Sequence, residues 1–169
     1  MEHIETERRF LIKMPAEELL SELGGDEIEQ IYLESEEGQT ERVRRREGHG
    51  RVTMTHTVKR RIGDISAVEE EHIITAAEFS ALREKIESGT RPVLKTRYVL
   101  PYRGHDFEID VYSEWRGVAV MEVELADEDE EFDIPPAIEV VKEVSGDRSL
   151  SNHSLSRRMP EEEEITRVI

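Results

Sequence analysis

The stretch Glu5-Thr6-Glu7-Arg8-Arg9-Phe10-Leu11 decides what kind of fold the chain can adopt. Side chains alternate between the two faces of a β-strand, so Glu5, Glu7 and Arg9 would share one face of a sheet. The same period of two recurs along most of the sequence, between turn signals that contain Gly. We therefore predict antiparallel strands joined by hairpins, at residues 5–13, 42–46, 51–61, 65–74, 93–100, 107–112 and 118–125.

Two other segments have the signature of helices. Residues 14–25 contain an early Pro, acidic residues in the first turn and Gly at the end. Thr75 and Glu78 form a capping-box pattern at the start of the second helix. A further helix is expected near residues 151–158. Helices therefore accompany the strands, and the fold class is α+β.

The composition limits the choice of compartment and partners. The length of 169 residues suits one domain, which we expect at residues 1–160 with an acidic tail at 161–169. The chain has no Cys and starts without an apolar segment, so we expect a cytoplasmic protein. Its net charge of -17 should repel nucleic acid and anionic membranes, so neither is expected as a partner. Both a monomer and a homodimer are compatible with the sequence.

Charges are sorted by strand instead of being mixed. Arg42 shares a strand face with Arg44, and Glu122 shares one with Glu124. A single pair of this kind usually marks only a strand face that is turned to water. Several such strands are harder to explain, because like charges side by side on a sheet repel one another. The sorted set therefore indicates a function.

Each kind of charged strand suits one ligand. Hard divalent cations prefer carboxylate oxygens, and Mg²⁺ is often shared between a few carboxylates and substrate phosphates. Rows of Arg and Lys can neutralise a chain of phosphates, and Arg can donate two hydrogen bonds to one phosphate. Closing the sheet into a barrel would place both sets inside, with the apolar strand faces outside under helices.

Short motifs also follow one another in a definite order along the chain. They are Glu5–Leu11, Gln30–Leu33, Arg42–Arg44, Thr57–Lys59, Glu69–Glu71, Lys95–Tyr98, Glu108–Tyr112 and Glu122–Leu125, followed by Asp147 and Ser151-Asn152. This series resembles the motifs of the CYTH superfamily, also called triphosphate tunnel metalloenzymes, over nearly the whole sequence. The order of the motifs is much more specific than any single motif.

The resemblance implies a closed antiparallel β-barrel of about eight strands that forms a tunnel, with helices packed outside. It also implies Mg²⁺ or Mn²⁺ as cofactor and a small-molecule triphosphate as substrate. The expected reaction is metal-dependent hydrolysis of inorganic tripolyphosphate to phosphate and pyrophosphate. The expected metal ligands are Glu5, Glu7, Glu69, Glu71, Asp110, Glu122 and Glu124. The expected phosphate-binding residues are Arg9, Arg42, Arg44, Lys59, Lys95 and Arg97.

Three of these residues are expected to be catalytic, namely Arg9, Tyr32 and Lys59. Water held by metal or by a carboxylate would attack the terminal phosphorus in line, and the cations would stabilise the departing diphosphate. Tyr32 could orient the substrate or this water. A buried Tyr whose hydroxyl is satisfied by a neighbour is an equally good interpretation.

The sequence departs from the superfamily pattern at three places. Arg9 stands where Lys is usual, Ala67 where many relatives have Arg, and Ser149-Leu150 where Arg-Tyr is common. Arg61 or Arg148 could replace the lost cations.

Two alternative functions stay open. One is a class IV adenylate cyclase, in which the ribose hydroxyl of ATP would attack the α-phosphate to give cyclic AMP. The other is a polyphosphate-binding or nucleotide-binding protein without catalysis. Aromatic residues make up only 5% of the chain and no Gly-rich nucleotide loop is present, which favours a small inorganic substrate without excluding a cyclase.

Overall fold

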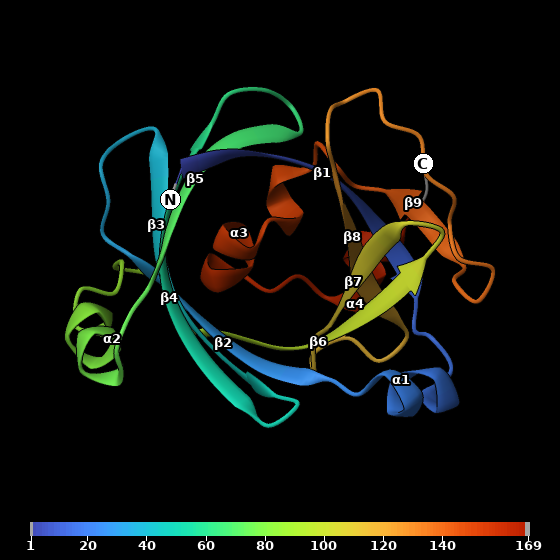
Figure 1. The fold of residues 1–169 in the computed structure, drawn as a ribbon, viewed down its shortest axis with the longest axis horizontal. Coiled ribbons are helices and arrows are strands. Elements are labelled where there is room, and N and C mark those ends of the chain that lie inside the picture. The colour runs from blue at the N-terminus through green and yellow to red at the C-terminus, as the bar shows by residue number, and fades with distance from the viewer. Residues whose placement is uncertain (1, 168–169) are drawn as a thin grey trace.

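The computed structural model describes residues 2–167, and its strands form a closed antiparallel barrel (Figure 1). The strands are β1 (Glu2–Lys13), β2 (Asp26–Leu33), β3 (Gln39–Gly48), β4 (Arg51–Arg61), β5 (Ser66–Ile73), β6 (Val93–Tyr102), β7 (His105–Val111), β8 (Val118–Leu125) and β9 (Val140–Glu143). The barrel order is β5-β4-β3-β2-β6-β7-β8-β1, and pairing of β5 with β1 closes the ring. This confirms the predicted fold class.

Strand β1 is long enough to complete the barrel and to hold an additional strand. Its first residues, 2–6, pair with β5, and residues 6–13 pair with β8 on the opposite edge. Residues 10–12 pair with the ninth strand, β9, which lies outside the ring. Both edges of β1 are therefore used, which leaves no open edge where the barrel closes.

The period of two did not predict β2 or β9. Strand β2 contains Ile28, Ile31 and Leu33, which are all buried although they do not lie on one face. A strand that is covered on both faces loses the alternation between apolar and polar residues, so its pattern resembles a continuous apolar run. Strand β9 is only four residues long.

The helices are α1 (Glu17–Leu23), α2 (Ala76–Arg83), α3 (Asn152–Arg157) and α4 (Glu162–Thr166), with a short 3-10 turn, η1 (Arg148–Leu150), before α3. Helix α2 has the predicted capping box, in which Glu78 N donates to Thr75 Oγ1 and Thr75 N donates to Glu78 Oε1, both at 3.1 Å. No helix within residues 2–167 is long and apolar enough to cross a membrane.

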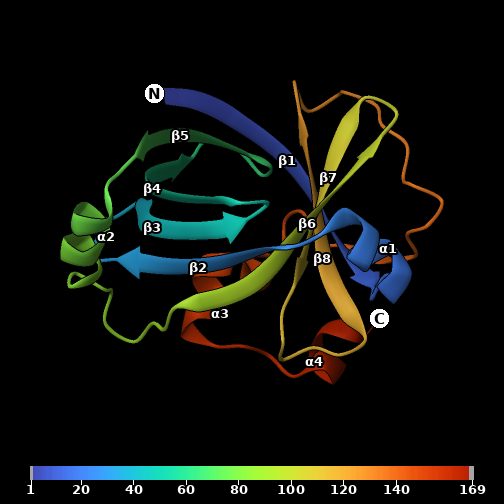
Figure 2. The same ribbon diagram turned by 60° about the horizontal axis from the view of Figure 1, so that its bottom comes forward.

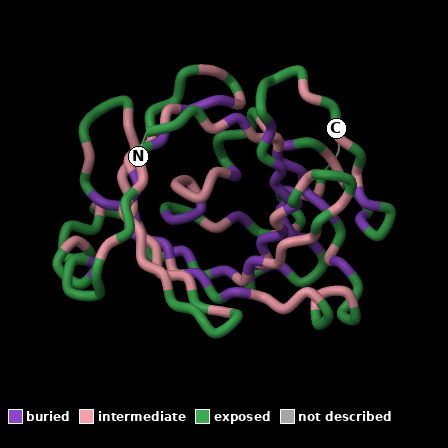
Figure 3. The backbone as a smooth tube through the Cα atoms, viewed as in Figure 1, coloured by how far each residue is buried: buried purple, intermediate pink, exposed green. Residues whose placement is uncertain are grey.

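The outward faces of the strands are apolar and covered in two ways. Phe79 of α2 packs with Ile31 and Val43, as predicted for helices outside the barrel. On the other side, Phe107 and Met121 belong to a buried cluster that is covered by the loop between β8 and β9. The long loops outside the ring are largely exposed (Figure 3).

The C-terminal segment fills part of the barrel. Helix α3 lies within the ring of strands when the molecule is viewed as in Figure 1, and it contacts β2 and β6. Leu150 and Leu155 pack there with Leu11 and Val120, whose side chains point inward. Figure 2 shows α3 below β2 and β6. One part of the interior is therefore apolar, and the remainder is free to hold the charged residues.

Residues 161–167 pack on the domain through α4, although they belong to the segment that was expected to be an acidic tail. Ile165 of α4 is 6% exposed and joins the same apolar cluster as Trp115. The Glu162 carboxylate accepts hydrogen bonds from the backbone N–H groups of Arg116 and Gly117. Arg158 also pairs with Glu164, and Lys142 Nζ donates to Arg167 O, so several contacts fix this acidic segment. Residues 168–169 of the expected tail lie outside the described residues.

Candidate active site

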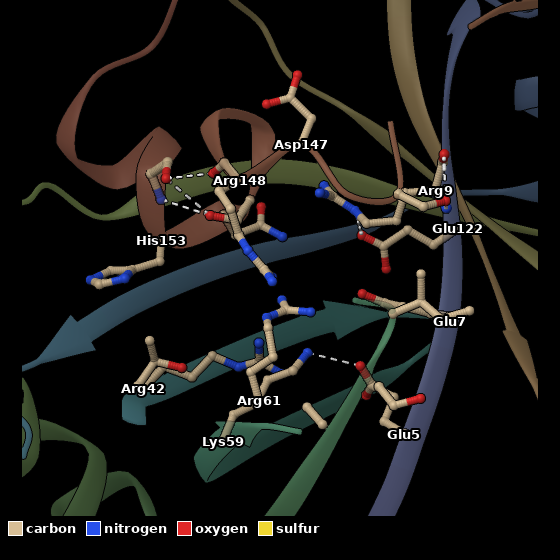
Figure 4. Close-up of a pocket in the computed structure, with 18 of the residues that line it drawn as sticks. Glu5, Glu7, Arg9, Arg42, Lys59, Arg61, Glu122, Asp147, Arg148 and His153 are labelled. Carbon is tan, nitrogen blue, oxygen red and sulfur yellow. Dashed lines mark hydrogen bonds and ion pairs between the residues drawn. The ribbon is translucent and has the colours of Figure 1, made fainter. Parts of the chain in front are cut away.

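Two adjoining cavities occupy the charged part of the barrel interior. The first cavity has a volume of about 320 Å³ and lies between β1, β3, β4 and residues 145–154 (Figure 4). The second cavity has a volume of about 270 Å³ and lies on the side of His3 and Glu124. Both are lined by Glu5, Glu7, Arg42, Lys59, Glu122 and Asn152.

The structure gathers six of the seven predicted metal ligands around the second cavity. Strands β1 and β8 are neighbours in a register that places Glu7 opposite Glu124 and Arg9 opposite Glu122. Strand β5 pairs with the other edge of β1. The six carboxylates are those of Glu5, Glu7, Glu69, Glu71, Glu122 and Glu124.

These carboxylates are too crowded to ionise independently. Burial, together with the charges of Glu122 and Glu5, raises the pKa of Glu7 to about 8. Burial and the hydrogen bond with Glu5 raise the pKa of Glu69 to about 7. Burial also opposes ionisation of Glu5, but the ammonium group of Lys59, 2.8 Å away, holds its pKa at about 2.

The arrangement fits a hard divalent cation. The atoms that these six residues can offer to a metal are all carboxylate oxygens, which such cations prefer. Glu69 is 4% exposed, and its Oε2 atom has no hydrogen-bond partner among residues 2–167. A cation would relieve the mutual repulsion that opposes ionisation of Glu7. Ligand atoms of His3, Glu5 and Glu69 also lie within 4.8 Å of one another.

Basic residues form the facing wall. Arg42 and Arg44 project inward from β3, and Lys59 projects inward from the neighbouring strand β4. Burial and the charges of Arg42 and Arg97 lower the pKa of Arg44 to about 9. Within residues 2–167, the buried Nε atom of Arg42 has no hydrogen-bond partner. Cations that repel one another beside a cavity create a site for an anion.

Lys95 and Asp110 do not line either cavity. Lys95 Nζ lies 2.8 Å from Asp110 Oδ2, and both side chains are 0% exposed. Arg97 completes the group by donating from Nε and Nη2 to the two Asp110 oxygens at 2.7 and 2.8 Å. The structure therefore pairs Lys95, a predicted phosphate ligand, with Asp110, a predicted metal ligand, outside the lining of both cavities. Arg97 alone of the three lines the second cavity.

Tyr32 combines features of both sequence interpretations. Its hydroxyl accepts a hydrogen bond from Gln30 Nε2 at 3.0 Å, and it also contacts the guanidinium of Arg42. Its ring lies 4.9 Å from that of His153, and Tyr32 lines the first cavity although it is 4% exposed. The hydroxyl thus has a partner and at the same time positions a residue of the basic wall.

Sequence reasoning missed several residues that line the first cavity. Asn152 accepts hydrogen bonds from Tyr112 Oη at 2.7 Å and from Lys95 Nζ at 3.3 Å, so it links the cavity to the buried ion pairs. His153 reaches the cavity because α3 enters the barrel. The only sequence signal for either was the Ser151-Asn152 motif, which contains Asn152 and directly precedes His153. Arg61 and Arg148, considered as replacements for lost cations, both line this cavity.

Known proteins share this architecture. The chain matches no protein-family model and no curated protein sequence. Among solved structures, the inorganic triphosphatase NE1496 is 28% identical, with 92% of this chain and 96% of the other covered and a TM-score of 0.59. A conserved hypothetical protein from Pyrococcus furiosus is 21% identical, with 73% and 80% covered and a TM-score of 0.53. A Bacillus halodurans protein proposed to be an adenylate cyclase is 17% identical, with 76% and 83% covered and a TM-score of 0.50. The last two show a common fold.

Proposed function

We propose that this chain, which belongs to the CYTH superfamily of triphosphate tunnel proteins, is a metal-dependent hydrolase of inorganic tripolyphosphate. The observation that carries the proposal is the pairing of two walls inside one barrel. The carboxylate wall consists of Glu5, Glu7, Glu69, Glu71, Glu122 and Glu124, and the basic wall consists of Arg42, Arg44 and Lys59. The similarity to an inorganic triphosphatase supports the same class of reaction. The absence of Cys favours the cytoplasm as the compartment.

The basic wall would bind the phosphate chain. Arg42 and Arg44 lie two residues apart on one strand face, so their guanidinium groups can contact successive phosphates. Lys59 is already within 2.8 Å of Glu5, which places an ammonium group at the boundary between the two walls. Several fixed cations would then neutralise the negative charge of a substrate that is bound there.

The carboxylate wall would hold Mg²⁺ or Mn²⁺ through Glu7, Glu122 and Glu124, with Glu5, Glu69 and Glu71 close by. When bound, the metal would polarise phosphoryl oxygens and lower the pKa of water. In the reaction, a water oxygen bonds to the terminal phosphorus as the bridging P–O bond breaks. The bond electrons leave with pyrophosphate, and the water proton passes to a lining carboxylate or to solvent. Guanidinium groups fixed beside the leaving pyrophosphate stabilise its charge without reorganisation.

An inorganic substrate agrees better with the cavity lining than a nucleotide. Stacking of a base requires a free aromatic face. Among the described residues that line the two cavities, the aromatic rings are those of Tyr32, His153 and His3. The first two already pack against each other, with ring centroids 4.9 Å apart and ring planes tilted by 36°. The remaining lining is dominated by charged and small polar side chains.

The test is release of phosphate and pyrophosphate from tripolyphosphate, ATP and thiamine triphosphate, each with Mg²⁺ or Mn²⁺. Glu122→Gln removes one inward carboxylate. Glu70→Gln is the matched control, because Glu70 points away from the cavities and is half exposed. We expect wild type and Glu70→Gln to cleave tripolyphosphate and Glu122→Gln to be inactive. Cyclic AMP formed from ATP alone would identify a cyclase instead, and binding without any product would identify a binding protein.

A further inference from the structure

Arg61 and Arg148 enter the first cavity from opposite sides. Arg61 is the last residue of β4, whereas Arg148 begins η1, 87 residues further along the chain. Figure 4 shows the two guanidinium groups facing each other inside the cavity, which Glu5 and Glu7 also line. Two unrelated segments thus bring like charges together.

Carboxylates compensate this pair only from a distance, because the charges of Glu7 and Glu5 act on Arg61 without an ion pair. Among residues 2–167, no carboxylate lies within ion-pair distance of either guanidinium. Arg61 Nη1 donates only to backbone carbonyls, with Asp64 O at 3.1 Å. Burial and the charge of Arg148 lower the pKa of Arg61. Both residues are exposed, so water weakens their repulsion, and an anion between them would be attracted by both charges.

The space for Arg61 is provided by its neighbour on the next strand. Arg61 is directly opposite Ala67 in the β4–β5 register, so both side chains lie on the same face. Ala67 is 2% exposed and lines the first cavity. A longer side chain there would compete with Arg61 for the cavity. On the other side, Ser149 turns its hydroxyl to Asp147 Oδ1 and leaves the cavity to Arg148.

We propose that Arg61 and Arg148 form an anion subsite, the arginine clamp, which binds the phosphate group farthest from the carboxylate wall. The clamp rests on the proposed function, because it assigns one end of the phosphate chain to this end of the tunnel. Two guanidinium groups from opposite sides can surround a phosphate with charge-assisted hydrogen bonds. A chain of three phosphates can reach both the clamp and the basic wall of Arg42, Arg44 and Lys59, whereas pyrophosphate held at the basic wall leaves the clamp unused. The clamp therefore makes the protein prefer tripolyphosphate to the shorter pyrophosphate.

The test is calorimetric titration of the 169-residue chain with tripolyphosphate and, separately, with pyrophosphate, in EDTA so that no metal-dependent turnover occurs. The variants are Arg61→Gln, Arg148→Gln and the conservative Arg61→Lys. Arg60→Gln is the matched control, because Arg60 is adjacent to Arg61 but alternates to the opposite face of β4. We expect each Gln variant to weaken tripolyphosphate binding about tenfold, as for the loss of a charge-assisted hydrogen bond. Arg61→Lys should retain part of the affinity.

The outcomes separate the clamp from hydrolysis. Weaker binding of tripolyphosphate with little change for pyrophosphate, in the clamp variants but not in Arg60→Gln, would support the clamp. Unchanged tripolyphosphate binding in both Gln variants, or an equal loss for both anions, would overturn it. Arginine-dependent binding by a wild-type protein that never hydrolyses tripolyphosphate would support the clamp and overturn only the hydrolase proposal. Failure of wild type to bind tripolyphosphate in EDTA would overturn the clamp, whereas the hydrolase proposal is tested by phosphate release with metal.

Discussion

Arg9 of β1 and Glu122 of β8 are direct cross-strand partners, and Arg9 Nε donates to Glu122 Oε1 at 3.0 Å. Their side chains are only 9% and 10% exposed. The same guanidinium donates from Nη2 to Leu150 O at 2.9 Å. Arg9 therefore connects the carboxylate wall to η1, which carries one half of the arginine clamp.

Replacing Arg9 by Lys should lower stability although it keeps the charge. A single ammonium group can remain beside Glu122 but cannot also occupy the fork position that reaches Leu150 O. We expect a loss of about 1.5–3 kcal/mol in the free energy of unfolding, as for a buried hydrogen bond to a charged group. Urea denaturation would measure it.

The control for this change is Arg8→Lys, because Arg8 lies next in sequence but its pair with Glu143 is partly exposed. It should cost only about 0–1 kcal/mol, as surface pairs do. Equal stability of Arg9→Lys and wild type would show that the bond to Leu150 O contributes nothing.

Metal binding should raise the melting temperature. A ligand that binds only the folded state at 100 times its Kd stabilises it by about 2.7 kcal/mol. We expect Mn²⁺ and Mg²⁺ to stabilise wild type and Glu70→Gln, and to have little effect on Glu122→Gln. Differential scanning calorimetry with and without EDTA would test this. An equal shift in all three proteins would place the metal away from the carboxylate wall.

The pKa of Glu7 predicts how the metal-free protein responds to pH. Its pKa is about 8 in the folded chain against 4.5 for the ordinary group, so the folded state binds more protons between these values. Stability must then fall as pH rises from about 4.5 to about 8. Glu7→Gln should show a weaker decline over this window, measured by urea denaturation in EDTA. Parallel profiles for the two proteins would contradict the crowding of carboxylates.

Alternation along strands predicted which face each charged residue would take, and this part of the site was predictable. Glu5, Glu7 and Arg9 line the first cavity together because a strand has no other way to place them. The position of each charged residue along the barrel axis was not predictable from alternation. Asp110 has the correct face, but the stagger between strands places it beside Lys95 and Arg97 instead of at the cavity.

The positions of the C-terminal residues were also beyond the sequence pattern. Asn152 and His153 line the first cavity only because α3 enters the barrel, which depends on long-range packing of Leu155. A short polar helix gives no periodic signal for such a position. Compensation by Arg61 could be considered from the sequence, but its place opposite Ala67 required the β4–β5 register.

The buried network predicts that Asp110→Asn will reduce stability more than metal affinity. Removing the carboxylate charge leaves Lys95 and Arg97 buried without their shared partner, and breaking such a pair typically costs about 3–5 kcal/mol. We expect a large loss in urea denaturation, with Mn²⁺ affinity close to wild type at a temperature where the variant is folded. Glu122→Gln should lower Mn²⁺ affinity as well as stability, because it also removes the buried partner of Arg9. Loss of Mn²⁺ binding in folded Asp110→Asn would instead show that Asp110 leaves its ion pairs and binds the metal.

The last helix should contribute measurably to stability although its sequence is mostly acidic. Ile165 is buried in the cluster that contains Trp115, so Ile165→Ala should cost roughly 2–5 kcal/mol. Glu163→Ala is the control on the same helix, because Glu163 is exposed, and its effect should lie within about 0.5 kcal/mol. Removal of residues 161–169 should destabilise at least as much as Ile165→Ala, because it also removes the Glu162 carboxylate that caps two backbone N–H groups. A truncated protein as stable as wild type would show that these residues form a dispensable tail after all.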